Sequence, residues 1–277
     1  MIEIKKYNTN KKWPKILFIW AIHWNEKCWT RAINKIINSI EKKQIELLSW
    51  EITFIAIANP DAYKNNVRYI DINLNRVIKE KKEAKLYEEK LANEITKVIK
   101  ENEIIVDLHS SHTDDEEFIF LDYQDEKNKF LAESCWIKNI ITGWPKLYKD
   151  TWDSDTWKFS HENWKISITV ECWNHFKNES NIVAENVIKN ILNSYWVIKE
   201  NKAYTSKDKK IVNVEKYIKK KSEWNLKENF QHLQKIKKWQ IIAEYKNWEK
   251  IIAKNDSYII LPFFDANIWD EWFYIWS

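Results

Sequence analysis

Two side chains with metal-binding chemistry lie three residues apart near the start of the chain, His23 and Glu26. They follow an apolar run over residues 15–22 that predicts a buried strand, and they precede helically spaced apolar residues over 28–40. We therefore expect the pair at a strand-to-helix turn, where ligands bind in open α/β sheets. A His and a Glu so placed are two of the three ligands of a His₂Glu catalytic zinc site. For this pair alone, the alternative is an ordinary polar turn.

The remaining polar candidates also follow predicted strands. A strand over residues 104–108 leads directly to His109, and a strand over 165–172 ends in Glu171. Because strand ends of a parallel sheet meet at one edge, His109 is the expected third metal ligand. His112 lies just past the same strand and is the alternative.

Arginine usage marks a third group. The chain has 45 Lys plus Arg, and only Arg31, Arg68 and Arg76 are Arg. Arg68 and Arg76 lie in one segment, residues 63–77, which has weak periodicity and is predicted to be a loop at the same edge. Arg is retained over Lys where a planar donor must hold a carboxylate or polarise a carbonyl.

The elements that must position these residues alternate between strand and helix. This pattern over residues 1–198 predicts an α/β sandwich with a mainly parallel sheet. Beyond it, residues 199–277 contain only short strand-like pieces and are predicted to form a small β-rich domain. The other predicted elements are strands over 45–58 and 118–123, helices over 80–100, 127–141 and 178–195, and a long loop over 142–164.

Composition excludes several classes of protein. No apolar run approaches the roughly 20 residues of a membrane span, and the amino terminus lacks a signal-peptide core, so a cytoplasmic protein without membrane contact is expected. The net charge of +4 is small for this length, so the composition does not indicate a nucleic-acid-binding protein. Cys28, Cys135 and Cys172 are odd in number and are expected to be reduced thiols.

Tryptophan and glycine are present in unusual proportions, 18 Trp against one Gly. Typical usage predicts about 19 glycines for this length. The 18 Trp and the one Gly of this chain together make the same number. Many Trp interleaved with Lys also raise the alternative of an aromatic-rich module that binds glycan or single-stranded nucleic acid. Against that alternative, the Trp fall at turn-like places rather than along one face.

Five motifs, in order, resemble those of the succinylglutamate desuccinylase/aspartoacylase family of the zinc carboxypeptidase-like superfamily. They are His23-Trp24-Asn25-Glu26, Asn59-Pro60, Arg68-Tyr69-Ile70-Asp71 through Leu74-Asn75-Arg76, Asp107-Leu108-His109-Ser110, and Val170-Glu171-Cys172. The resemblance implies a three-layer α/β/α sandwich of the zinc-carboxypeptidase type with a small β-rich carboxy-terminal domain. It also implies Zn²⁺ held by His23, Glu26 and His109, with Glu171 as the general base.

For the substrate, the resemblance implies that Arg68 polarises the scissile carbonyl while Asn75 and Arg76 clamp the α-carboxylate. The chain departs from the family at Asn73, where an Asp is usual. A carboxylate-binding Tyr of the carboxy-terminal region has no secure counterpart, and Tyr274 is the one candidate.

These features favour a zinc-dependent amidohydrolase that cleaves the amide of a small N-acyl amino acid. The alternative within the same chemistry is a zinc carboxypeptidase acting on small peptides, and self-association into a homo-oligomer stays open. The resembling family has Gly where this chain has Trp20, Trp24, Trp29 and Trp173. We therefore predict that most of the 18 Trp are glycines in the cell, through a codon reassigned to glycine.

Overall fold

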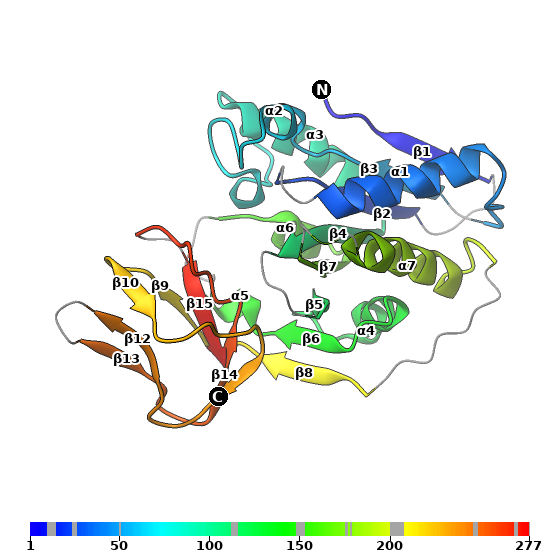
Figure 1. Cartoon of the computed structure of the whole chain (residues 1–277). Helices are drawn as coiled ribbons and strands as arrows, with labels where there is room; N and C mark the ends of the chain where they lie inside the picture. Colours follow the sequence, from blue (N-terminus) through cyan, green and yellow to red (C-terminus); the bar gives the residue numbers. More distant parts are fainter. Residues whose placement is uncertain are drawn as a thin grey trace.

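The computed structural model describes residues 1–9, 15–23, 27–49, 51–111, 116–147, 153–174, 177, 179–199, 208–245, 249–268 and 271–276. Its centre is an eight-stranded sheet (Figure 1). The strand order is β1 (Lys5–Asn8), β3 (Glu51–Ile55), β2 (Lys15–Trp20), β4 (Ile104–Ser111), β7 (Ile166–Asn174), β5 (Phe118–Phe120), β6 (Asn139–Thr142) and β8 (Lys210–Asn213). Strands β3, β2, β4 and β7 are parallel to one another, whereas β1 pairs with β3 and β5 pairs with β7 in antiparallel fashion.

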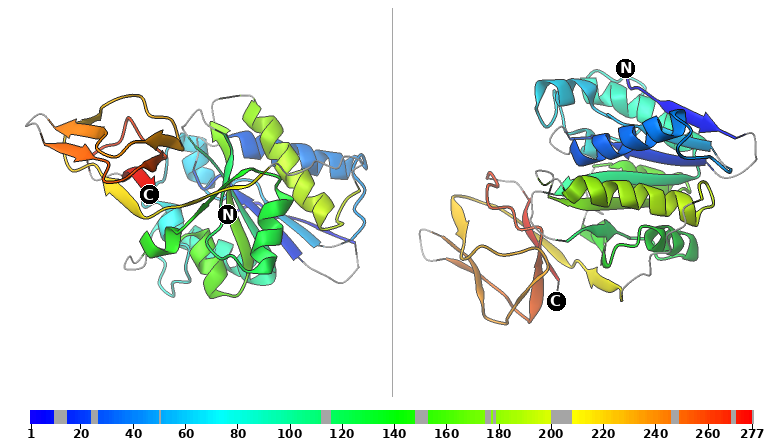
Figure 2. Two further views of the ribbon diagram at one scale, coloured as in Figure 1. Left: turned by 90° about the horizontal axis from the view of Figure 1, so that it is seen from below. Right: turned by 45° about the vertical axis from the view of Figure 1, so that its right-hand side comes forward.

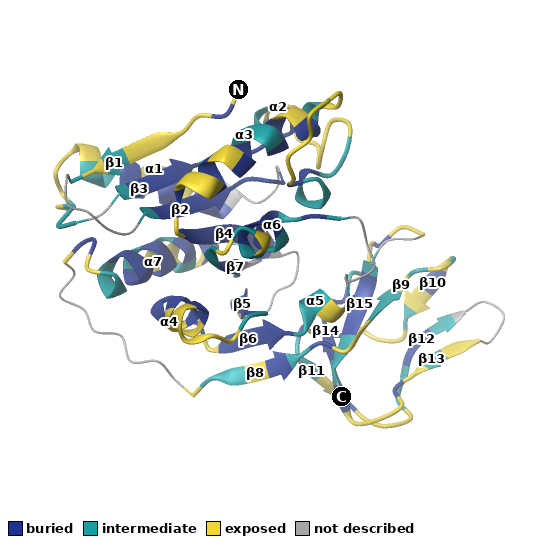
Figure 3. Cartoon of the chain, turned by 180° about the vertical axis from the view of Figure 1, so that it is seen from behind, coloured by how far each residue is buried: buried dark blue, intermediate teal, exposed yellow. Residues whose placement is uncertain are grey.

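Helices cover both faces of this sheet, which makes three layers. One face packs against α1 (Lys27–Glu41), α4 (Glu126–Ser134) and α7 (Glu179–Ser194), and the other against α3 (Tyr87–Glu101) and α6 (Thr156–Glu162) (Figure 2). Strand β2 shows why, since alternate residues enter the two cores and none of its apolar side chains is exposed. The strands of the sheet are accordingly largely buried in Figure 3. The three-layer α/β/α prediction is confirmed.

A smaller β-rich unit follows β8. It contains the sheets β10-β12-β13 and β11-β14-β15-β9, with a core of its own. Its strands are β9 (Lys216–Lys219), β10 (Trp224–Leu226), β11 (Gln234–Ile236), β12 (Ile241–Tyr245), β13 (Lys250–Ile252), β14 (Ser257–Ile260) and β15 (Glu271–Trp276). A shared apolar cluster joins β6 and β8 to β14 and β15, through Ile141, Val212, Ile260 and Tyr274. Strand β8 belongs to the large sheet, so the strands of the β-rich unit begin with β9. The division of the chain into two domains at residue 198 stays a prediction.

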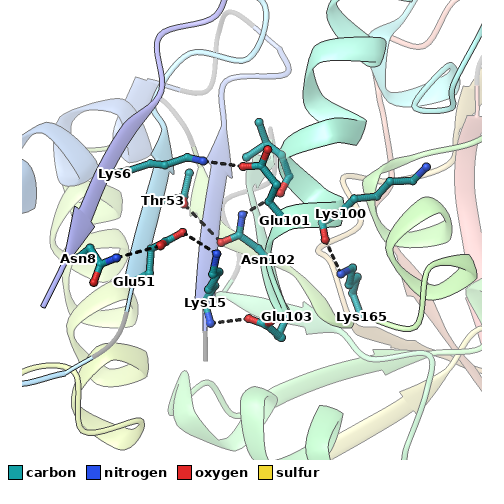
Figure 4. A network of polar contacts seen from close by, with 11 residues as sticks. Lys6, Asn8, Lys15, Glu51, Thr53, Lys100, Glu101, Asn102, Glu103 and Lys165 are labelled. Atoms are coloured by element: carbon teal, nitrogen blue, oxygen red, sulfur yellow. Dashed lines mark hydrogen bonds and ion pairs between the residues drawn. The ribbon is translucent and has the colours of Figure 1, made fainter. Parts of the chain in front are cut away.

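Hydrogen bonds and ion pairs connect residues at the amino-terminal ends of the strands (Figure 4). The backbone N–H of Lys15 donates to Glu103 Oε2 at 2.6 Å, and its Nζ pairs with Glu51 at 3.4 Å. Buried Asn102 accepts from the Thr53 hydroxyl and donates to a carbonyl at the end of α3. These contacts fix the edge of the sheet opposite the carboxyl ends, where the predicted site lies.

Several predicted elements are wrong in extent. The helix expected over 127–141 ends at Ser134 because Trp136 adopts a left-handed backbone, and β6 begins at Asn139. The helix expected from residue 80 begins at Tyr87, and the strand expected from 45 begins at Glu51. The expected loop over 142–164 contains α5 (Trp144–Leu147) and α6. Among the described helices, none is long and apolar enough to cross a membrane.

Candidate metal and substrate site

Three of the predicted residues meet at the carboxyl ends of adjacent parallel strands. His23 follows β2 by three residues, His109 lies on β4, and Glu171 lies on β7 directly opposite His109 in the strand register. The two imidazoles are 5% and 4% exposed, and their ring centroids are 5.6 Å apart. A pair of buried imidazoles beside a carboxylate is a donor set that suits zinc.

Each imidazole is oriented by a neighbouring polar side chain. The Oδ2 atom of buried Asp107 lies 3.1 Å from Nε2 of His109, and Asn73 Oδ1 lies 3.3 Å from Nε2 of His23. Polar partners at this distance help to fix the ring orientation of a metal-ligating histidine. Asn73 therefore serves His23 with an amide where the resembling family carries a carboxylate.

Glu26, the other predicted ligand, lies outside the described residues, as do Trp24 and His112, the alternative to His109. Within the described ranges, no group of three His, Cys, Asp or Glu side chains is arranged to hold one ion. Asp107 Oδ1 is nevertheless buried without a hydrogen-bond partner among these residues. The two histidines and their orienting groups fit a metal, and the set needs one further ligand.

Glu88, a fully buried residue of α3, binds the backbone of the loop that carries Arg68 and Arg76. Its two carboxylate oxygens accept from the backbone N–H groups of Ile70, Asp71 and Ile72 at 2.7, 3.0 and 3.2 Å. A buried carboxylate that accepts several N–H bonds fixes a loop because breaking them leaves a buried charge unsatisfied. Sequence reasoning did not single out this residue.

A short 3₁₀ turn, η1 (Leu74–Arg76), places Asn75 and Arg76. Asn73 begins the turn, since its Oδ1 also accepts from the Asn75 N–H at 3.0 Å. The half-buried Arg76 guanidinium pairs loosely with Asp153 at 3.7 Å and with Glu271 of β15 at 3.6 Å. Arg76 thus lies where the loop over residues 63–77 meets β15 of the β-rich unit.

A cavity of about 220 Å³ lies beside Arg76. Its lining includes Asn75, Arg76 and Asp155, together with Tyr123 and His161, whose stacked rings have centroids 3.3 Å apart. Burial raises the pKa of Asp155, and the Asp107 carboxylate raises it further. The Lys158 N–H, which donates to Asp155 at 2.7 Å, lowers this pKa, as do the charges of Arg76 and His109. Asp155 is thus a residue of the cavity lining that lies near both Arg76 and His109.

The other two predicted substrate residues differ in position. Arg68 lies in an exposed stretch after α2 (Pro60–Asn65) and is not among the described residues that line the cavity. Tyr274, which had no secure role, donates its hydroxyl to Glu271 at 2.6 Å and so stands next to a partner of Arg76. Glu271 was missed because no local pattern connects residue 271 to a loop almost 200 residues earlier.

The three cysteines form no disulfide with one another, in agreement with the predicted reduced thiols, and all three are buried. Burial raises the pKa of the Cys135 thiol. Buried thiols with a raised pKa are poor nucleophiles, so Cys135 is not a candidate for the chemistry.

Comparison with known proteins now bears on the same residues. Residues 12–192 match the family model described as the succinylglutamate desuccinylase/aspartoacylase catalytic domain. The chain belongs to this family. Its members are desuccinylase- and aspartoacylase-like deacylases, which are hydrolases. No curated protein matches the chain in sequence.

Solved structures agree on the fold. Succinylglutamate desuccinylase from Vibrio parahaemolyticus superposes with a TM-score of 0.74 at 16% identity, covering 99% of this chain and 85% of that one. The succinylglutamate desuccinylase/aspartoacylase of Rhodobacter sphaeroides gives 0.78 at 14% identity over 100% and 88% of the two chains. A product-bound ectoine utilization protein EutE (DoeB) from Ruegeria pomeroyi gives 0.76 at 15% identity, with 100% and 88% covered.

Proposed function

We propose that this protein is a zinc-dependent amidohydrolase that cleaves the amide bond of a small N-acyl amino acid. The observation that carries the proposal is the convergence of His23, His109 and Glu171 at the ends of β2, β4 and β7. Family membership supports the hydrolase class, since the family comprises deacylases.

The metal would be held by His23, His109 and Glu26. When bound, zinc supplies Lewis-acid polarisation and makes a water more acidic. Asp107 and Asn73 hold the two imidazoles so that little reorganisation is needed when the ion enters. Burial of both rings excludes competing water from the ligand nitrogens.

Glu171 would act as the general base. Its carboxylate accepts a proton from the attacking water and then gives that proton to the leaving amine. Its position opposite His109 in the register supports this role, because the base must reach a water beside the metal ligands.

Arg68 would donate hydrogen bonds to the scissile carbonyl oxygen as negative charge develops there. Asn75 and Arg76 would bind the α-carboxylate of the amino-acid half. The ion pairs of Arg76 with Asp153 and Glu271 are longer than an ordinary hydrogen bond. A substrate carboxylate would form two parallel, shorter bonds with the guanidinium in the bidentate arrangement that Arg favours.

The test is hydrolysis by zinc-loaded protein of a panel of N-acyl amino acids, measured as released amine. Glu171→Gln should keep its zinc and lose roughly 10²–10⁴ in rate, whereas Glu126→Gln, on the exposed face of α4, should match the parent. Cleavage of small peptides in preference to acyl amino acids would favour the carboxypeptidase alternative. A Glu171→Gln variant with full activity contradicts the proposed mechanism.

A further inference from the structure

Tryptophan occupies backbone positions that an indole side chain disfavours. Of the nine non-glycine residues with positive φ in the described ranges, four are Trp: Trp136 (59°), Trp164 (59°), Trp196 (58°) and Trp239 (71°). Trp makes up only about one residue in fifteen of this chain. In the left-handed region Cβ crowds the following carbonyl, and bulky residues there are outliers.

Two of these positions are helix ends that usually take glycine. After α6, the Trp164 N–H donates to the carbonyl three residues back and the Lys165 N–H to the carbonyl five back. Trp196 and Val197 repeat the same two bonds after α7. This pair of bonds defines the Schellman motif, whose left-handed residue is typically Gly.

The third clear position is a turn. The Gln240 N–H donates to the Lys237 carbonyl at 2.9 Å, which makes Trp239 the third residue of a four-residue turn with φ of 71°. A turn with positive φ at its third residue is the type that requires Gly or Asn. The sole glycine, Gly143, meets the same kind of demand, because a Cβ there would lie 2.5 Å from the Val214 carbonyl oxygen.

The side chains of several Trp lack a structural role that would justify them. Trp164, Trp196 and Trp239 are 94%, 78% and 71% exposed. They follow three different elements, α6, α7 and β11. Trp272 is the opposite case, since its indole N–H is buried without a hydrogen-bond partner among the described residues. Buried indole N–H groups usually find an acceptor.

We propose that the protein made in its source cell carries glycine at most of the 18 tryptophan positions, because one codon there is read as glycine. The αL backbone at helix ends and turns, the exposed indoles and the near-absence of glycine have this single cause. The proposal extends to the substrate site, where Trp144 and Trp157 line the cavity beside Arg76. Glycine at either position would leave a wider cavity for the substrate.

Peptide mass spectrometry of the protein from its source cells tests the proposal directly. Glycine at residues 136, 164, 196 and 239 is expected, and tryptophan at these residues would overturn it. The gene gives a second readout, since ordinary UGG tryptophan codons at these positions would also overturn it.

A recombinant comparison tests the backbone argument by itself. The chain as written here is changed at the four positive-φ Trp to Gly in one variant and to Ala in a matched control, and both are unfolded in urea. Ala removes the indole but keeps the Cβ that is strained at positive φ, whereas Gly removes both. The equilibrium constant for unfolding of the Gly variant should therefore be lower than that of the Ala variant by roughly fivefold or more per site. Equal stability of the two variants would contradict the argument, as would a loss of stability in the Gly variant alone.

Discussion

Asp107 and His109 lie on the same face of β4, two residues apart, and the Asp107 carboxylate is 3.1 Å from Nε2 of the imidazole. Both are almost fully buried at the carboxyl edge of the sheet. A carboxylate placed on the far nitrogen of a metal-ligating histidine raises the basicity of the ligand and fixes its orientation. The strand period of two residues thus places the proposed ligand His109 and a carboxylate that can orient it within one three-residue motif.

Asp107→Asn tests this relationship. The amide keeps the size of the side chain but removes the charge, so zinc affinity should fall by about 10–100-fold. Competition with a chelator of known affinity measures the change. Asp256→Asn, on an exposed loop, is the matched control and should bind zinc as the parent does. Unchanged affinity in Asp107→Asn would show that the carboxylate does not support the ligand.

Asn73→Ser separates the two tasks of Asn73. Serine still begins a helical turn well, so η1 should persist and the urea midpoint should change little. Its shorter hydroxyl cannot reach His23, whose Nε2 is 3.3 Å from the Asn73 amide oxygen. Zinc affinity should therefore fall while stability stays near the parent value. A fall in stability with no change in zinc affinity would reverse the assignment.

Arg76→Lys should mainly weaken substrate binding, because an ammonium cannot form the bidentate pair with a carboxylate. KM for the best acyl amino acid should rise by roughly tenfold or more, with a smaller effect on kcat. Arg31→Lys makes the same chemical change on the exposed face of α1 and should leave both constants unaltered. Equal KM values for Arg76→Lys and the parent would exclude the clamp.

Asp122 predicts a pH dependence of stability. Burial raises its pKa to about 7, against backbone hydrogen bonds from Trp144 and Gly143 that lower it. Since the folded state holds this proton and the unfolded state releases it near pH 4, stability is lost as pH rises from about 4 to 7. Asp122→Asn should match the parent near pH 4 and exceed it at pH 8 by on the order of 2–4 kcal/mol. Urea unfolding at both pH values checks this, and a difference that does not grow with pH would contradict it.

The sheet and the site edge were predictable from local patterns. Apolar runs such as that of β2 and the polar residue after each run identify the strands and place His23, His109 and Glu171 at one edge. The ordered motifs then identify the family, and the family match over residues 12–192 confirms it. Local signals sufficed for these three candidates because each lies at the carboxyl end of a strand of its own.

What the sequence did not reveal depends on contacts between distant segments. Glu271 reaches Arg76 from β15, and no pattern within either segment encodes that pairing. Glu88 carried a signal, since it is an acidic residue beside the apolar face of its predicted helix, but only the structure shows the three N–H groups that it holds. The end of α4 was missed because Trp at residue 136 gives no stop signal, whereas Gly there would give one.

Zinc titration of the metal-free protein tests the central claim most directly. The parent should bind one zinc ion per chain tightly, and His23→Ala, Glu26→Ala and His109→Ala should each lose most of that affinity. His161→Ala, which alters a histidine of the cavity wall, is the control and should bind zinc like the parent. Zinc binding by His109→Ala equal to that of the parent would contradict the account.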